Sequence, residues 1–212
     1  MEAASRYEKE DFSCAFLLLG WPVYFALYYL TETRIPREQC IPVHLWVDDL
    51  VPFCEWFVIP YVLWYFWIVF SLVFFLCRDP VSFRRLQTYF MLLQAAAIVI
   101  CILVPNRQDL RPEVFPRDNV LSRAVALLYR VDTSTGVCPS LHVALSVAMA
   151  SVWRKVPGIA KGWKVFFTAS AVLVSLSTML IKQHSAVDVL AALVLCWAAE
   201  QIIYRDRHRG NF

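Results

Sequence analysis

The stretch IKQHSAVDVLAALV places a histidine and an aspartate, His184 and Asp188, inside an otherwise apolar run. A spacing of four residues puts both side chains on one face of a helix. A carboxylate within an apolar membrane helix costs about 2.5–3.5 kcal/mol on insertion scales, so it usually faces a polar cavity and a partner. A carboxylate that accepts a hydrogen bond from one imidazole nitrogen fixes the tautomer and leaves the other nitrogen free to react. The pair therefore indicates a reactive histidine.

A second histidine, His142, lies in CPSLHVALS, just after the turn-forming DTSTG and Pro139. We expect Ser140 and His142 to stand at a helix N-terminus, where free backbone N–H groups and the positive helix end form an anion site. His142 and His184 are 42 residues apart, and two membrane crossings take about 40 residues. The two imidazoles are therefore expected to meet at one depth on the same face of a membrane.

Three basic residues lie near these histidines in the sequence. Lys182 precedes His184 by two residues, and Arg107 and Arg111 lie in the segment before Pro139. Cations, N–H donors, two imidazoles and a carboxylate suit phosphoryl transfer, in which positioning and charge stabilisation dominate. The chain has neither a glycine-rich phosphate loop nor a carboxylate cluster suited to Mg²⁺, so nucleotide chemistry is not expected. A second interpretation of Lys182 is an interfacial lysine whose ammonium reaches out of the bilayer.

The elements that carry these residues have the composition of membrane helices. Of the 212 residues, 59% are hydrophobic and 17% are charged, against about half and a quarter in soluble domains. We expect an all-α fold: a single domain, 1–212, that forms an integral membrane bundle of six transmembrane helices, with its catalytic motifs within about 106–190. A crossing needs about 20 apolar residues, and the runs that meet this are 12–31, 53–77, 86–105, 163–181 and 186–204, with a sixth from about Pro139 to Lys155.

The distribution of charge argues for an orientation and against some partners. The net charge is +3, and Lys and Arg lie in short patches between the apolar runs, so no nucleic-acid partner is expected. With the N-terminus in the cytoplasm, twelve of the twenty Lys and Arg residues fall on the cytoplasmic side, as the positive-inside rule favours. We expect a multi-pass plasma-membrane protein with both termini in the cytoplasm and the active site on the outer face. The segment between Asn106 and Pro139 is the exception to the rule, because it holds five arginines.

The motifs resemble those of the type-2 phosphatidic acid phosphatase superfamily over roughly residues 86–204. CPSLH resembles its P-S-G-H motif, and STMLIKQHSAVD resembles its third motif, which is S-R, five residues, H, three residues, D. LRP at 110–112 resembles the end of its first motif, which is K, six residues, R-P. Leu141 replaces the glycine, and Val104 and Thr178 stand where the motif lysine and arginine would be. The P-S-L-H form also resembles the branch that contains sphingomyelin and inositol phosphorylceramide synthases.

This resemblance implies catalytic roles for three residues. His184 would be the nucleophile that forms a phosphohistidine, and Asp188 would orient and charge its imidazole. His142 would protonate the leaving alcohol and then activate the acceptor. The implied activity is a metal-independent membrane phosphatase that hydrolyses a lipid phosphate monoester or diphosphate.

The resemblance also implies how the phosphate is held. Ser140 and the helix N-terminus would bind phosphate oxygens, and Arg111 would be the matching cation of the first motif. Lys182 and Arg107 are expected to substitute for the two missing cations. Neither a metal nor an organic cofactor is implied; the expected partners are a lipid phosphate substrate and the bilayer.

Three alternatives stay open at this point. A phosphotransferase that passes a phospho-headgroup to an alcohol, as sphingolipid synthases do, would use the same histidines. A non-catalytic lipid-binding relative is possible because two motif cations are missing. A metal-dependent hydrolase could use His142, His184 and Asp188 as ligands. The sequence specifies neither the lipid nor the oligomeric state.

Overall fold

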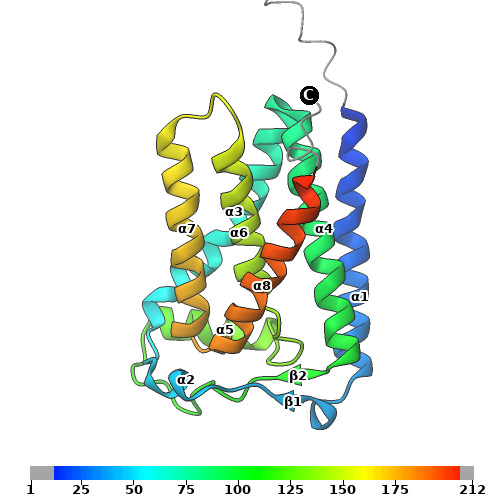
Figure 1. The fold of residues 1–212 in the computed structure, drawn as a ribbon. Helices are drawn as coiled ribbons and strands as arrows, with labels where there is room; N and C mark the ends of the chain where they lie inside the picture. Colours follow the sequence, from blue (N-terminus) through cyan, green and yellow to red (C-terminus); the bar gives the residue numbers. More distant parts are fainter. Residues whose placement is uncertain (1–11, 206–212) are drawn as a thin grey trace, which may run out of the picture.

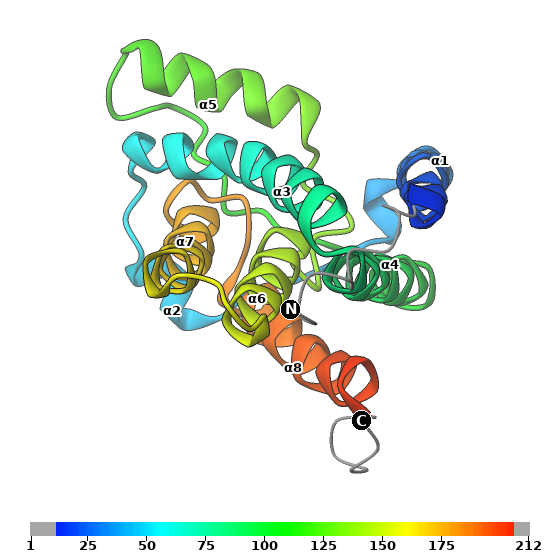
Figure 2. The same cartoon turned by 90° about the horizontal axis from the view of Figure 1, so that it is seen from above.

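Helices that run along one axis make up most of the structure, a computed structural model that describes residues 12–205. A 3-10 helix, η1 (Phe12–Leu19), leads into α1 (Gly20–Arg34), and β1 (Ile41–Pro42) pairs in parallel with β2 (Asn106–Arg107). Figures 1 and 2 show the lengthwise helices α1, α3 (Val58–Arg78), α4 (Pro80–Leu103), α6 (Leu141–Lys155), α7 (Lys161–Leu180) and α8 (Ala186–Ile203). The expected all-α class is confirmed.

Five helical segments are long and apolar enough to cross a membrane: Cys14–Arg34, Glu55–Arg78, Pro80–Leu103, Lys161–Leu180 and Ala186–Ile203. The expected sixth, α6, has only 15 residues and is not among them, so the count of six spans is not confirmed. Eleven of the α6 residues are buried inside the protein. A helix whose neighbours are other helices needs neither the length nor the apolar surface of one that faces lipid.

The core surrounds α6 and is rich in aromatic rings. Trp153 is fully buried, stacks on Phe167 with ring centroids 4.3 Å apart, and packs against Phe75 at 4.7 Å. Its indole N–H donates to Ser71 Oγ at 3.0 Å, so the polar atom of this buried ring is paired. These contacts lock α6 between α3 and α7 and fix the height of its N-terminus, where His142 lies.

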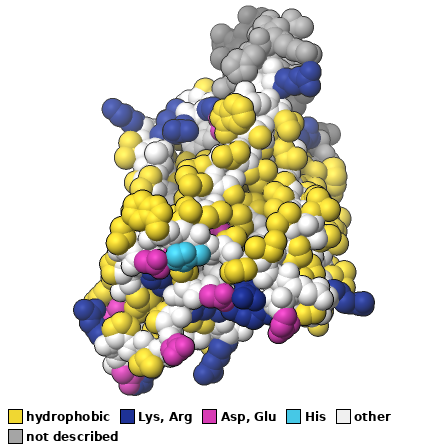
Figure 3. Space-filling view, turned by 60° about the horizontal axis from the view of Figure 1, so that its bottom comes forward, with side chains coloured by type: hydrophobic (Ala, Val, Ile, Leu, Met, Phe, Trp, Pro, Cys, Tyr) yellow, Lys and Arg dark blue, Asp and Glu magenta, His cyan; other side chains and the backbone are white. Residues whose placement is uncertain are grey.

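The loops at one end of the bundle are longer than those at the other. This loop end holds η2 (Arg37–Gln39), α2 (Trp46–Leu50), η3 (Glu55–Phe57) and α5 (Val120–Val131). Figure 1 shows α5 crosswise to the helix axis at this end, and Figure 2 shows it at the outer edge beside α3. Figure 3 shows apolar side chains over the flank of the molecule and acidic and basic side chains gathered at the loop end. The start of α6 and the turn between α7 and α8 both lie at the loop end, as expected from the spacing of the two histidines.

Candidate active site

His184 and Asp188 form the pair that their spacing predicts. His184 Nδ1 lies 3.2 Å from Asp188 Oδ2, and the carboxylate is completely buried. The same oxygen accepts a 2.9 Å hydrogen bond from the backbone N–H of Ser185, which caps α8. The carboxylate thus fixes the imidazole through Nδ1 and leaves Nε2 as the nitrogen available for reaction.

The turn between α7 and α8 that carries His184 is held by hydrogen bonds from two segments of the loop end. Tyr129 Oη donates to the Ile181 carbonyl at 2.5 Å, and Gln108 Nε2 donates to the Lys182 carbonyl at 3.1 Å. Lys182 itself has a φ of 55°, in the left-handed region that a side chain disfavours. A backbone conformation of this kind persists only where surrounding contacts hold it in place. The hydrogen bonds from Tyr129 and Gln108 are such contacts.

Asp48 of α2 connects the loop end to the start of α8. Its carboxylate is 2% exposed and accepts hydrogen bonds from Ser185 Oγ at 2.6 Å and from the Ala186 N–H at 2.8 Å. The N–H of Leu45 also donates to it, at 2.8 Å. Asp48 therefore positions the residues that follow His184, a role that sequence analysis did not identify.

His142 occupies the first turn of α6, opposite His184. The two imidazole centroids are 5.7 Å apart. The rings of Tyr61 and Trp64 each pack on the His142 ring with centroids 4.3 Å apart. His142 is 9% exposed, and its Nε2 has no hydrogen-bond partner among the described residues. Two imidazoles thus face each other with a free nitrogen on each.

Ser140 caps α6, as expected, but its hydroxyl is committed to the helix. Its Oγ accepts from the Val143 N–H at 3.5 Å, and the side chain is fully buried. The N–H groups of Leu141 and His142 donate to no acceptor within residues 12–205. These two N–H groups, rather than the Ser140 hydroxyl, are the donors that the helix start offers to an anion.

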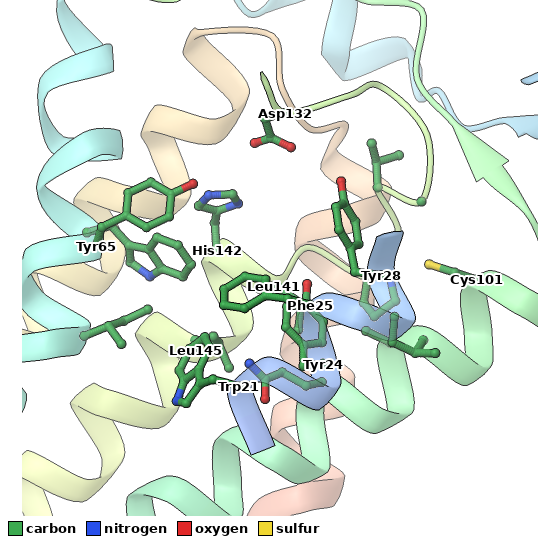
Figure 4. Close-up of a pocket in the computed structure, with 18 of the residues that line it drawn as sticks. Trp21, Tyr24, Phe25, Tyr28, Tyr65, Cys101, Asp132, Leu141, His142 and Leu145 are labelled. Carbon is green, nitrogen blue, oxygen red and sulfur yellow. The ribbon is translucent and has the colours of Figure 1, made fainter. Parts of the chain in front are cut away.

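A cavity of about 620 Å³ opens beside the histidines. It lies between α1, α3, α4 and α6, and its lining includes both His142 and His184. Figure 4 shows Asp132 next to His142, with Tyr65 on one side and Tyr28 on the other. Among the described residues that line the cavity, Asp132 carries the one carboxylate, and none is Lys or Arg.

The three basic residues predicted to bind phosphate do not line this cavity. Lys182 Nζ donates to the carbonyls of Asp48 and Val51, at 2.7 and 2.5 Å. Burial lowers the pKa of the Lys182 ammonium, and the carboxylate of Asp48 opposes that shift. The ammonium therefore stabilises the loop that holds α8, and the structure does not bring it to the histidines.

The two arginines are also engaged within the loop end. Arg111 donates to the carbonyls of Tyr129 and Asp132, at 3.0 and 2.6 Å, and lies over the Tyr129 ring. Burial lowers the pKa of its guanidinium. Arg107 pairs with Asp109 at 3.1 Å and donates to the carbonyl of Arg37. Arg111 is therefore linked to the cavity through the backbone of Asp132, whereas the Arg107 guanidinium is engaged with Asp109 and Arg37 outside the cavity lining.

Two residues that the sequence did not single out stand next to His142. Tyr61 Oη donates to Asp132 Oδ2 at 2.5 Å and lies 3.4 Å from His142 Nδ1. Gln183 Nε2 reaches the same phenol oxygen at 3.5 Å. Asp132 begins DTSTG, which was recognisable only as a turn, and Tyr61 lies in an aromatic-rich run without a polar pattern, so neither residue could be singled out from the sequence.

A metal site receives no support from the arrangement of these side chains. Within residues 12–205, no group of three or more His, Cys, Asp or Glu side chains is placed to hold a metal ion. His184 Nδ1 already lies 3.2 Å from Asp188 Oδ2, so these two atoms are engaged with each other. The arrangement suits a nucleophile and a proton carrier better than a ligand set.

Comparison with protein families agrees with this geometry. The model of the PAP2 superfamily matches residues 85–211, which is more than half of the chain. The chain belongs to the PAP2 superfamily. Comparison with curated proteins and with solved structures returns no significant match. PAP2 membership supports a phosphatase or phosphotransferase type of chemistry on lipid phosphates, and the apolar helices indicate a membrane protein.

The structure shows what occupies the two PAP2 motif positions that lack a cation. Val104 ends α4 and is half exposed. Thr178 is fully buried in α7; its hydroxyl donates to the Ser175 carbonyl at 2.8 Å, and its own carbonyl accepts from the N–H groups of Gln183 and His184. Both PAP2 positions are thus filled by side chains that cannot bind phosphate, and the second supports the His184 turn instead.

Proposed function

We propose that this PAP2 protein breaks a phosphate ester bond of a membrane lipid through a covalent phosphohistidine at His184. The observation that supports the proposal is the pair of imidazoles, 5.7 Å apart, that line one apolar cavity, one of them hydrogen-bonded to a buried carboxylate. Room for a tetrahedral phosphorus between two imidazole nitrogens is what nucleophilic attack and proton donation to the leaving group require.

In the first half-reaction His184 acts as the nucleophile and His142 acts as the general acid. His184 Nε2 attacks phosphorus, a P–N bond forms, and the P–O bond to the lipid alcohol breaks. Protonated His142 gives its proton to the leaving oxygen, and Asp188 stabilises the positive charge on the His184 imidazole through Nδ1. The N–H groups at the start of α6 bind the phosphate oxygens.

The second half-reaction needs an acceptor with a hydroxyl group. Neutral His142 takes a proton from the acceptor, whose oxygen attacks phosphorus as the P–N bond breaks and His184 is restored. With water as the acceptor the reaction is hydrolysis of a lipid phosphate, and we place it at the outer face of the plasma membrane, with both termini in the cytoplasm. With an alcohol as the acceptor it is a phosphotransfer.

One observation favours the phosphotransfer as a second candidate. The rings of Tyr61, Trp64 and Tyr65 surround His142, and the cavity continues between apolar helix faces. An acceptor alcohol attached to a lipid chain would fill such a site more completely than water does.

Trapping of the covalent intermediate tests the proposal. Purified protein is mixed with a panel of phospholipids labelled on phosphorus and quenched in denaturant, and the adduct is mapped by mass spectrometry. We expect a phosphate adduct on His184 that is stable in base and labile in acid. His184→Ala should abolish it, whereas His44→Ala, which changes an exposed histidine paired with Asp49, should leave it unchanged. An adduct on another residue, or turnover retained by His184→Ala, would disprove the mechanism.

The products separate the remaining alternatives. Free phosphate or a free phospho-headgroup indicates hydrolysis, and a new phosphodiester on an added lipid alcohol indicates transfer. Turnover that survives a strong chelator excludes a metal-dependent hydrolase. A folded protein that binds lipid but turns over none of the panel would be the non-catalytic relative.

A further inference from the structure

The cavity beside the histidines has an unusual charge for a phosphate site. Phosphate sites normally supply Lys or Arg side chains as partners for the anion. Here Lys182, Arg111 and Arg107 are bound to backbone carbonyls or to Asp109, outside the cavity lining. The charged side chain that lines the cavity is a carboxylate, Asp132; it accepts a hydrogen bond from Tyr61 Oη, and it forms no salt bridge with a Lys or Arg side chain of residues 12–205.

This charge discriminates between classes of lipid phosphate. A phosphate monoester carries a charge of about −1.5 to −2 at neutral pH, because its second pKa is about 6. A dianion taken out of water next to the Asp132 carboxylate, which Tyr61 hydrogen-bonds but no cation neutralises, would be strongly disfavoured. A phosphodiester carries a single negative charge, and a headgroup that also bears an ammonium is neutral overall. The cavity therefore suits a substrate that brings its own cation.

The surroundings of Asp132 suit an ammonium. Figure 4 shows the Tyr28 and Tyr65 rings on either side of Asp132 and His142. An ammonium near a carboxylate and over aromatic rings gains from both ion pairing and cation–π attraction. A second carboxylate, Glu32, lies at the rim, where it accepts hydrogen bonds from Thr135 at 2.9 and 3.0 Å. Thr135 itself lines the cavity, so the negative potential extends to its outer edge.

Buried polar atoms in the lining indicate that the cavity is built for a polar ligand. His142 Nε2, Gln183 Oε1 and both amide atoms of Gln94 have no partner among the described residues. Gln94 and Gln183 are each 2% exposed. Buried polar groups without a partner are rare in folded proteins, and each calls for an explanation, such as a catalytic role or a bound polar group. A phosphodiester and its headgroup would supply acceptors and donors to them.

The rest of the cavity is apolar and suits acyl chains. From His142 it continues along α1 and α3, past Phe25, Ile68 and Leu72. Its walls from α1 and α3 lie outside residues 85–211, the part that matches the PAP2 family. The apolar part of the cavity thus comes largely from segments that the family match does not cover, whereas Asp132 lies within the matched residues.

We infer that the cavity binds a zwitterionic phospholipid: a phosphodiester whose headgroup alcohol carries an ammonium that lies at Asp132, between Tyr28 and Tyr65. The inference rests on the proposed function for the fate of the phosphorus. His184 attacks it, the P–O bond to the glycerol oxygen breaks, and that oxygen takes the proton from His142. Diacylglycerol leaves, and the headgroup phosphate stays on His184 until water or an alcohol accepts it.

Turnover of four matched lipids tests the inference. Protein in nanodiscs is given phosphatidylcholine, phosphatidylethanolamine, phosphatidylglycerol or phosphatidate with identical acyl chains, and diacylglycerol is measured by mass spectrometry. We expect kcat/KM for one or both ammonium lipids to exceed that for phosphatidylglycerol and phosphatidate by tenfold or more. The ratio of kcat/KM for the choline lipid to kcat/KM for the ethanolamine lipid reports whether the aromatic rings or the carboxylate contribute more to recognition of the ammonium. Equal or faster turnover of phosphatidylglycerol or phosphatidate would overturn the inference and leave the proposed function intact.

Variants locate the selectivity. Asp132→Asn should reduce the preference for phosphatidylcholine over phosphatidylglycerol by tenfold or more, and Tyr65→Leu should reduce it without disturbing the core, because Tyr65 is 47% exposed. Asp118→Asn is the matched control, since it removes a carboxylate of the same loop that pairs with Arg123 at the surface. A general loss of activity with an unchanged preference in both Asp132→Asn and Tyr65→Leu would show that they do not contact the headgroup.

Binding separates a failure of this inference from a failure of the proposed function. Lipid bound to His184→Ala protein is measured by native mass spectrometry in the same four-lipid competition. Preferential retention of the ammonium lipids supports the inference even if the wild-type protein turns over no lipid. In that case only the proposed function is contradicted. Equal retention of all four lipids contradicts it.

Discussion

The backbone N–H of Ser140 donates a 3.1 Å hydrogen bond to the backbone carbonyl of Asp188. This bond joins the first turn of α6 to the first turn of α8. Each turn carries or follows one of the two histidines, so the main chain itself sets how far apart the imidazoles lie. Side-chain substitutions at the site should therefore change the chemistry without separating the two segments.

Removal of either imidazole should stop turnover in a protein that stays folded. His142→Ala should lower kcat by about 10²–10⁴, the range for loss of a general acid–base group, and His184→Ala should lower it to background. Asp188→Asn should cost less than His184→Ala, because it alters only the orientation and charge of the imidazole. Single-turnover kinetics with the best lipid of the panel measures all three. Substantial activity in either alanine variant would rule out a mechanism with two histidines.

Asp48→Ala should lower both stability and activity, although Asp48 touches no cavity-lining atom. It leaves buried donors at Ser185, Ala186 and Leu45 without their acceptor, at a cost of about 1–3 kcal/mol for an unsatisfied buried group. Thermal unfolding in detergent should show a lower midpoint, and kcat should fall while KM changes little. Asp49→Ala is the matched control, because Asp49 is exposed and pairs with His44. An equal effect of both variants would show that Asp48 does not position the start of α8.

Lys182→Met should mainly reduce stability. The ammonium holds two carbonyls of the segment that contains α2, and its loss frees that segment while the cavity lining is unchanged. We expect a lower unfolding midpoint and a change in KM of less than about threefold. A rise in KM of tenfold or more at unchanged stability would instead return Lys182 to the phosphate site that the sequence suggested.

Arg111→Lys distinguishes a bridging guanidinium from a point charge. Arg111 spans two backbone carbonyls, at Tyr129 and Asp132, and an ammonium cannot reproduce that planar fork. Arg111→Lys and Arg111→Met should therefore both reduce kcat/KM, by about tenfold. Recovery of normal kinetics by the lysine variant alone would mean that the charge at this position acts on phosphate directly.

The orientation of the chain can be tested at the loop end. Val114 lies in the loop before α5 and is 82% exposed, so Val114→Cys should react with a membrane-impermeant maleimide added to intact cells. A cysteine at Gly162, at the start of α7 with open space around it, should react only after the cells are opened. The wild-type chain supplies the background labelling of its native cysteines. The reverse pattern would put the active site on the cytoplasmic side.

Periodic elements made part of the site predictable. The spacing of His184 and Asp188 fixed their common helix face, and Ser140 marked the start of α6, because a helix determines which residues are neighbours. The distance between the histidines followed from the length of two helices. The family resemblance found from the same motifs is confirmed by the match over residues 85–211.

Side-chain direction outside the helices was not predictable. Lys182 is two residues from His184, but its left-handed backbone and the carbonyls of α2 send the ammonium away from the histidine. Asp132 and Tyr61 meet at His142 only because α3 packs beside α6 and the segment after α5 returns to it. The bounds of α6, Leu141–Lys155, agree with the expected segment, but its burial among neighbouring helices is a property of packing that the sequence does not display.

The helix that contributes Tyr28 to the cavity is scarcely supported by the rest of the protein. Of the apolar window in Cys14–Arg34, only 6% is buried inside the structure, and Figure 2 shows α1 at the edge of the bundle beside α4. One wall of the cavity is thus a helix that contacts α4 through Trp21 and presents most of its surface to the surrounding acyl chains. The bilayer acts as a structural component of the site, so its thickness and lateral pressure set the shape of the space in which the reaction takes place.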